Sequence, residues 1–230
     1  MKRVLVATSN PGKIRDLVGA ARAHNVEIAP LPDFASLPTV VEDGLTFEAN
    51  ARKKAEYYSK YAEGDVVIAD DSGLEVDALK GAPGVRSARY AADEGTAQVT
   101  AQKKGANLGH KLGHKAHDAN SDDEANNARL LRELHDVPDE FRAGRFVCVI
   151  AAARNGHTLA TFHGTAEGII LREPRGSNGF GYDPLFYFPE ISKTFAELSA
   201  EEKARYSHRG AAFRAFLAWE DESGDRHPHW

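Results

Sequence analysis

The segment VLVATSNPGK, residues 4–13, decides how the fold begins. Its first four residues are apolar, as in a buried strand, and the next six form a polar turn. Beyond the turn, apolar residues recur at helical spacing, at Ile14, Leu17, Val18 and Ala21. This pattern predicts a strand, a turn and a helix, which is the opening unit of an α/β protein.

The turn from Thr8 to Lys13 has properties that suit phosphate. A turn leading into a helix N-terminus presents free backbone N–H groups and the positive end of the helix dipole. Gly12 permits a close backbone approach, and Lys13 adds a positive charge. The spacing is not that of a Walker A loop, which needs further glycines and a Lys-Ser/Thr pair. An ordinary capped turn is the alternative interpretation.

Strand and helix patterns alternate along the rest of the chain. The first half has a helix at 46–61 and a buried strand at 66–69, which is ended by Asp70-Asp71-Ser72-Gly73. Strands at 145–153 and 157–171 follow, joined by an Asn155-Gly156 hairpin. A capping box at 199–202 starts a helix, which 207–210 interrupts, and a last helix covers 211–219. This alternation predicts an α/β fold. The length of 230 residues favours one domain or two closely joined lobes, and we take residues 1–230 as a single domain.

Composition excludes several classes of protein. The net charge of -5 gives no electrostatic footprint for nucleic acid. No apolar stretch is long enough for a signal peptide or a membrane span, so a cytoplasmic location is expected. The single cysteine, Cys148, cannot form an internal disulfide and is predicted to be a small buried apolar residue.

Two segments differ from the rest. Residues 93–127 are rich in small and polar residues, which predicts an exposed, flexible insertion. The polar tail at 220–230 is expected to be frayed.

Acidic residues follow the strand at 66–69. Asp70 and Asp71, placed where a strand leaves the sheet, could hold a hard cation, with Glu42 and Asp43 as possible co-ligands. A carboxylate there could orient or deprotonate water. A solvated Asp-Gly turn is the alternative.

Two further constellations could contact a flat, charged ligand. In the segment 177–184, glycines flank Phe180 and could hold its ring open for stacking, while Asp183 could accept hydrogen bonds from a base edge. An aromatic loop packed in the core is the alternative. Lys193, His208 and Arg209 lie near helix starts, where they could meet a carbonyl or a phosphate, or simply be surface charge.

Taken together in this order, the motifs TSNPGK (8–13), DDSGL (70–74), GAPGVRSARY (81–90), GFGYDP (179–184) and SHRG (207–210) resemble those of the inosine triphosphate pyrophosphatase family, whose bacterial members are the dITP/XTP pyrophosphatases. The resemblance covers residues 1–92 and roughly 129–218. It implies an elongated central mixed sheet with flanking helices and two lobes around a long substrate cleft. It also implies a homodimer.

The same resemblance implies an activity. Family members use Mg²⁺ to cleave nucleoside triphosphates between the α and β phosphates, releasing pyrophosphate. They prefer ITP, dITP and XTP, and so clear deaminated purines from the nucleotide pool.

The resemblance also assigns roles by position. The triphosphate would be held by the loop of Thr8, Ser9, Asn10, Pro11, Gly12 and Lys13, together with Asn50 and Lys54. Asp71 would accept the proton and, with Glu42, hold the metal. Ser72 would touch the substrate, Phe180 would stack on the base, and Gly181, Tyr182 and Asp183 would complete that loop. Lys193, His208 and Arg209 would contact the base edge.

The segment after Tyr90 departs from the family by being about twenty residues longer. Two alternatives stay open: a pyrophosphatase that clears other modified nucleotides, and a nucleotide-binding protein without turnover.

Overall fold

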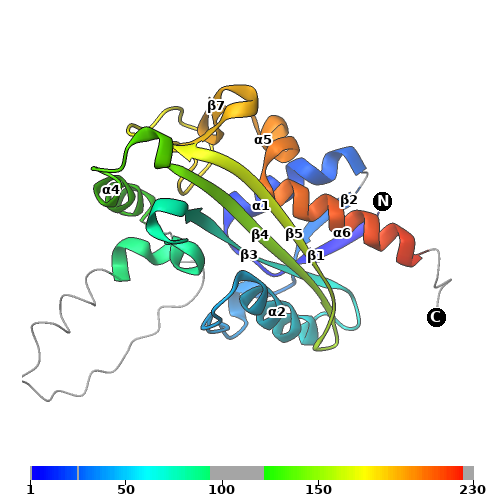
Figure 1. Cartoon of the computed structure of the whole chain (residues 1–230). Helices are drawn as coiled ribbons and strands as arrows, with labels where there is room; N and C mark the ends of the chain where they lie inside the picture. The colour runs from blue at the N-terminus through cyan, green and yellow to red at the C-terminus, as the bar shows by residue number, and fades with distance from the viewer. Residues whose placement is uncertain (1, 25, 94–121, 225–230) are drawn as a thin grey trace, which may run out of the picture.

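The computed structural model describes residues 2–24, 26–93 and 122–224 (Figure 1). Its strands are β1 (Lys2–Val6), β2 (Val26–Pro30), β3 (Val67–Val76), β4 (Ala143–Arg154), β5 (His157–Ile170), β6 (Phe186–Phe188) and β7 (Lys193–Thr194). Its α-helices are α1 (Pro11–Ala21), α2 (Phe47–Tyr58), α4 (Asp123–Glu133), α5 (Ala200–Tyr206) and α6 (His208–Gly224). Short 3₁₀ helices join them at Arg22–His24, Phe34–Ser36, Ser59–Tyr61, Asp77–Leu79, Gly84–Arg89, Asp139–Phe141, Pro189–Ile191 and Phe195–Glu197.

The described strands form one mixed sheet in the order β2-β1-β3-β4-β5-β6-β7. β1 pairs in parallel with both β2 and β3, and every pair from β3 onward is antiparallel. The predicted α/β class and mixed sheet with flanking helices are therefore confirmed. The two lobes implied by the resemblance stay a prediction.

Helices cover both faces of the sheet (Figure 1). On one face, α2 packs its alanines and aromatics against β1, β3 and β4. On the other face, α1, α5 and α6 pack on alternate residues of the same strands. β1 is followed by α1 on one face, whereas β2 is followed by α2 on the other. The chain therefore changes face at the carboxyl end of β1, where open sheets bind ligands.

The β4–β5 hairpin is the longest feature of the sheet and crosses the whole molecule (Figure 1). Its turn residues Asn155 and Gly156 both have positive φ, 51° and 84°. This is the geometry that two-residue hairpins need, and asparagine and glycine adopt it at little cost. The predicted hairpin is thus confirmed.

A third apolar cluster closes the end of the sheet that lies far from both termini. Leu130 and Leu134 of α4 pack there with Phe146, Phe186 and Phe195. Tyr182 also belongs to this cluster, so the loop that carries Phe180 is built on a rigid base.

Three expected boundaries are corrected. β3 does not end at Asp70-Asp71-Ser72-Gly73 but runs through them to Val76, because β4 pairs with it along its full length. Most of the predicted insertion, 94–121, lies outside the described residues, but Asp123 already begins α4, and Asn126 is buried. α6 continues to Gly224, so the tail predicted at 220–230 is helical over its first residues, and 225–230 lie outside the described part.

In the described part of the chain, none of the helices is both long and apolar enough for a membrane span.

Candidate active site

Two adjacent aspartates define the site by pointing to opposite faces of the sheet. Side chains alternate along a strand, so Asp71 shares the α2 face with Val67 and Ala69, while Asp70 shares the other face with Ile68. Both side chains are buried. The parallel pairing of β1 with β3 brings the turn that follows β1 beside them, since the N–H of Ala7 donates to the Ile68 carbonyl.

Asp71 is held by the helix α2. Asn50 Nδ2 donates to Asp71 Oδ2 at 2.9 Å, and Lys54 Nζ lies 3.9 Å from Asp71 Oδ1. One turn apart on α2, Asn50 and Lys54 share a face as predicted, and Lys54 Nζ also donates to Glu42 at 2.8 Å. Burial raises the pKa of Asp71 above its usual value, although Lys54 and Lys13 oppose the rise. A carboxylate made more basic in this way suits proton acceptance.

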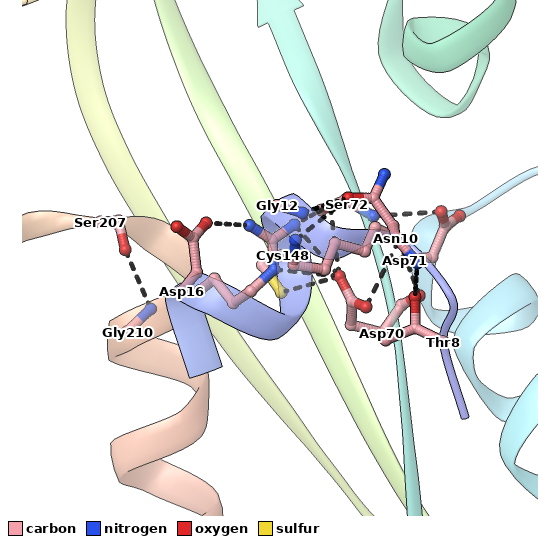
Figure 2. A network of polar contacts seen from close by, with 12 residues as sticks. Thr8, Asn10, Gly12, Asp16, Asp70, Asp71, Ser72, Cys148, Ser207 and Gly210 are labelled. Atoms are coloured by element: carbon pink, nitrogen blue, oxygen red, sulfur yellow. Dashed lines mark hydrogen bonds and ion pairs between the residues drawn. The ribbon is translucent and has the colours of Figure 1, made fainter. Parts of the chain in front are cut away.

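Asp70 points to the other face, and Ser72, which bonds to both aspartates, links it to Asp71 in the network of Figure 2. Asp70 Oδ2 accepts from Arg209 Nε and Nη2, both at 3.2 Å, and Lys13 Nζ lies 3.4 Å from Asp70 Oδ1. Arg209 also donates to Asp16 at 2.7 Å and to Ser72 Oγ at 2.6 Å. Burial alone would raise the pKa of Asp70, but Lys13 and Arg209 outweigh burial and hold that pKa well below its usual value.

The turn after β1 caps α1 with its own side chains. Asn10 Oδ1 accepts from the N–H groups of Gly12 and Lys13 at 2.8 and 3.1 Å, while the Asn10 N–H donates to Thr8 Oγ1. The prediction of free N–H groups here is wrong, because Asn10 is the N-cap and Pro11, at the first helical position, has no N–H. Ser9 is exposed beside them.

Charged groups of this turn and of α2 meet around a small cavity. Its lining includes Thr8, Lys13, Glu42, Lys54 and Asp70, and its volume of about 20 Å³ is roughly that needed for one water molecule. The predicted phosphate residues Lys13 and Lys54 and the predicted metal carboxylate Glu42 are therefore brought together.

Phe180 lies over the start of α1. A Cβ atom on Gly12 would come within 2.5 Å of the Phe180 ring, so glycine is the residue that permits this contact. Two cations also make cation–π contacts with the ring: Lys203 Nζ lies 4.7 Å and the Arg209 guanidinium carbon 5.6 Å from its centroid. The aromatic loop and the turn after β1 therefore form one site.

Two residues of that loop point inward. Asp183 is 2% exposed, and its Oδ2 accepts from the Phe180 N–H at 2.8 Å and from Lys203 Nζ at 2.5 Å. Tyr182 is buried, and its hydroxyl donates to the Ser87 carbonyl. In this structure both polar groups hold the loop, and their contacts with the substrate stay a prediction.

Lys203 is the site residue that sequence reasoning missed. It is 5% exposed and lies between Asp183 and Asp16, beneath the Phe180 ring. Lys193 instead pairs with Glu202 at 2.9 Å, and both of those side chains are 42% exposed. The sequence signal was the helix started by Ser199, which places Lys203 one turn before Ser207.

His208 and Arg209 are brought to the site but are buried in it. Arg209 is 1% exposed, and its guanidinium is occupied by Asp16, Asp70 and Ser72. His208 stacks on Phe146 with ring centroids 4.7 Å apart, and burial lowers the pKa of His208 well below its usual value. Among the described residues His208 Nδ1 has no hydrogen-bond partner, whereas the Arg209 guanidinium is fully engaged; contact of both residues with a base edge stays a prediction.

Cys148 is fully buried, as predicted, and its Sγ lies 4.0 Å from Asp70 Oδ2. Burial raises the pKa of its thiol, which excludes it as a thiolate nucleophile at neutral pH.

The donor set of Glu42 and Asp71 fits a hard cation. Both carboxylates lie within 4 Å of the same atom, Lys54 Nζ, and so can reach one cation between them. No group of three or more such ligands occurs among the described residues. Two carboxylates are nevertheless what Mg²⁺ uses when phosphate oxygens complete its coordination.

Comparison with known proteins identifies the family. The Ham1 family model matches residues 4–219, which is nearly the whole chain. The chain belongs to the Ham1 family. This confirms the resemblance drawn from the five motifs, because curated relatives of the chain carry the expected activity in their names.

Two such relatives are dITP/XTP pyrophosphatases. The protein of Acidobacterium capsulatum is 48% identical over 93% of this chain and 95% of its own length. That of Desulforamulus reducens is 43% identical over 92% of both chains.

Solved structures of Ham1 proteins have the same fold as this chain. The protein from Coxiella burnetii is 36% identical with a TM-score of 0.73, and that from Staphylococcus aureus is 37% identical with a TM-score of 0.72. Each alignment covers 96% of this chain and 100% of the other.

Proposed function

We propose that this protein hydrolyses deaminated purine nucleoside triphosphates, namely ITP, dITP and XTP, to the monophosphate and pyrophosphate. The observation that carries the proposal is Asp71 of β3, a buried carboxylate of raised pKa beside Lys54 and Glu42, close to the turn that follows β1. Membership of the Ham1 family and the names of its relatives support the substrate class.

The triphosphate binds over the small cavity between α1 and α2, which by itself has room for about one water molecule. Lys13 and Lys54 supply the positive charge, and the Thr8 side chain lines the same cavity. The exposed Ser9 adds a hydroxyl on the turn, and Asn50 holds Asp71 in position. Because Asn10 already caps the backbone N–H groups, binding depends on these side chains more than on the helix terminus. Alanine at either lysine would therefore weaken binding of every nucleotide alike.

Glu42 and Asp71 would hold Mg²⁺ at this end of the site. The ion would supply neutralisation of phosphate charge, which would make the leaving pyrophosphate less basic. Asp71 accepts the proton of the attacking water, which its raised pKa favours. The reaction needs no covalent intermediate, and the buried thiol of Cys148 offers none.

The base binds at the other end, against Phe180. The ring supplies stacking, and Lys203 supplies an N–H for the 6-keto group that hypoxanthine and xanthine share. Lys203 takes this role in place of Lys193, since it lies under the ring and retains a third N–H beyond those directed to Asp183 and Asp16. Adenine, with an amine at this position, leaves the donor without an acceptor and is disfavoured.

Pyrophosphate release from ITP, XTP, GTP and ATP with Mg²⁺ tests the proposal. Wild type should favour ITP and XTP, and Asp71→Asn should abolish release. A matched pair of variants tests the metal. Glu42→Gln should raise the Mg²⁺ concentration needed for half-maximal activity. Asp43→Asn should not, because the Asp43 carboxylate pairs with the exposed Lys53.

Other outcomes favour the alternatives. Preferred turnover of other modified nucleotides would support a different house-cleaning substrate, and ITP binding without turnover would support a binding protein.

A homodimer and a cytoplasmic location belong to the same proposal. The dimer rests on the family resemblance, and sedimentation of the purified protein tests it; the location is the expectation drawn from the sequence.

A further inference from the structure

The peptide groups of Gly181, next to Phe180, are held by two side chains of α4. The Gly181 N–H donates to Asp123 Oδ2 at 2.6 Å, and the Gly181 carbonyl accepts from Asn127 Nδ2 at 2.9 Å. Asp123 and Asn127 lie four residues apart, so they share one face of the helix. We call these two residues the α4 clamp.

The clamp completes the hydrogen bonding of the aromatic loop. The Phe180 N–H donates to Asp183, and the Phe180 carbonyl accepts from the Asp183 N–H at 3.3 Å. With the clamp in place, every backbone polar group of Phe180 and Gly181 has a partner within the protein. Gly181 has a positive φ of 62°, and glycine adopts positive and negative φ about equally readily. Hydrogen-bond partners are therefore what hold Gly181 in this turn.

The helix that carries the clamp is itself fixed. Asn126, 3% exposed, accepts from the Ala91 N–H and donates to the Ala88 carbonyl. The neighbouring asparagines of α4 therefore contact two different segments: Asn126 contacts residues 88–91, and Asn127 contacts the aromatic loop. Leu130 and Leu134 are fully buried in the third apolar cluster. Figure 1 shows α4 at the end of the molecule far from both termini, where it supports this loop from outside the sheet.

We propose that Asp123 and Asn127 are positioning residues for base binding: by fixing Gly181 they hold the Phe180 ring in place before substrate arrives. This rests on the proposed function. A side chain held in its bound position loses less conformational entropy on binding, so the clamp raises affinity for the base. It does not touch the phosphate end, where Lys13, Lys54 and Asp71 act.

Steady-state kinetics with ITP tests the proposal. Asn127→Ala removes one hydrogen bond of about 1 kcal/mol, so KM should rise about fivefold while kcat stays within about twofold. Asn127→Asp should raise KM further, because a carboxylate would face the Gly181 carbonyl. Inhibition by inorganic tripolyphosphate, which lacks a base, should keep its wild-type Ki in both variants.

Matched variants separate positioning from general stability. Asp123→Ala should raise KM, whereas Asp123→Asn keeps an acceptor oxygen and should restore it. Glu124→Gln removes the same charge from the first turn of α4 and should leave KM unchanged. The proposal is overturned if Asn127→Asp leaves KM at the wild-type value, or if the tripolyphosphate Ki rises in parallel with KM.

Amide exchange distinguishes failure of this inference from failure of the proposed function. If wild type releases no pyrophosphate from ITP, the function falls, but the clamp can still be measured by NMR. Protection of the Gly181 amide should be lost in Asp123→Ala and kept in Glu124→Gln. Equal protection in all three proteins would overturn the clamp.

Discussion

Replacement of Arg209 by alanine should destabilise the protein more than any exposed substitution. Arg209 joins Asp16 on α1 to Asp70 on β3, and its own side chain is 2% exposed. The substitution leaves two buried carboxylates without their shared cation. Removing one partner of a buried ion pair typically costs about 3–5 kcal/mol, mainly because the remaining charge is uncompensated.

The structure places the expected loss near the lower end of that range. Asp70 retains Lys13 at 3.4 Å, and Asp16 retains Lys203 at 3.5 Å, so neither acid loses all its countercharge. We therefore expect the free energy of unfolding to fall by about 3 kcal/mol. Arg205→Ala, on the exposed side of α5, should change it by less than about 0.5 kcal/mol.

Urea unfolding followed by circular dichroism at pH 7.5 and pH 5 measures this. In wild type, the low pKa of Asp70 keeps it ionised across this range. Because burial is the largest influence on the pKa of Asp70, we predict that loss of Arg209 raises that pKa in the folded state above the unfolded value. The folded variant then binds more protons than the unfolded chain, and falling pH stabilises it. The difference in the free energy of unfolding between wild type and Arg209→Ala should therefore shrink toward pH 5. A difference below about 1 kcal/mol at pH 7.5 would refute the ion-pair account.

Three further perturbations follow from the site. Lys203→Met should raise KM for ITP at least tenfold, whereas Lys193→Met, at an exposed pair, should leave kcat/KM within about twofold in the same assay. Gly12→Ala would place a methyl group against the ring of Phe180 and should lower kcat/KM for ITP, with unchanged kinetics counting against the observed packing. His208 has a folded pKa below its unfolded value, so it should lower the free energy of unfolding as pH falls below about 6.5, by up to about 1.4 kcal/mol per pH unit. In urea titrations at several pH values, His208→Phe should reduce this pH dependence. The same pH dependence in the variant and the wild type would contradict the burial of His208.

Local patterns predicted much of the fold because the responsible interactions are local. The Asn155-Gly156 turn, the capping box at Ser199 and the helix after Pro11 each depend on residues a few positions apart. The end of β3 was mispredicted for the opposite reason. Asp70-Asp71-Ser72-Gly73 has the composition of a turn, but pairing with β4 keeps it extended.

That one difference explains much of the site. In a turn, the two aspartates would share one environment, whereas in a strand they face opposite layers. Asp71 thus meets α2, and Asp70 meets Arg209, which is 139 residues away in sequence. No local pattern reveals such a partner. The resemblance located the motif, but it did not show that Arg209 is buried between two acids.

The most direct test of the central claim is ³¹P NMR of ITP incubated with the wild-type protein and Mg²⁺ in ¹⁸O-enriched water. The account predicts inosine monophosphate and pyrophosphate, with the heavy oxygen on the monophosphate, because water attacks the α phosphorus. Formation of inosine diphosphate and inorganic phosphate, or heavy oxygen on the pyrophosphate, would contradict it.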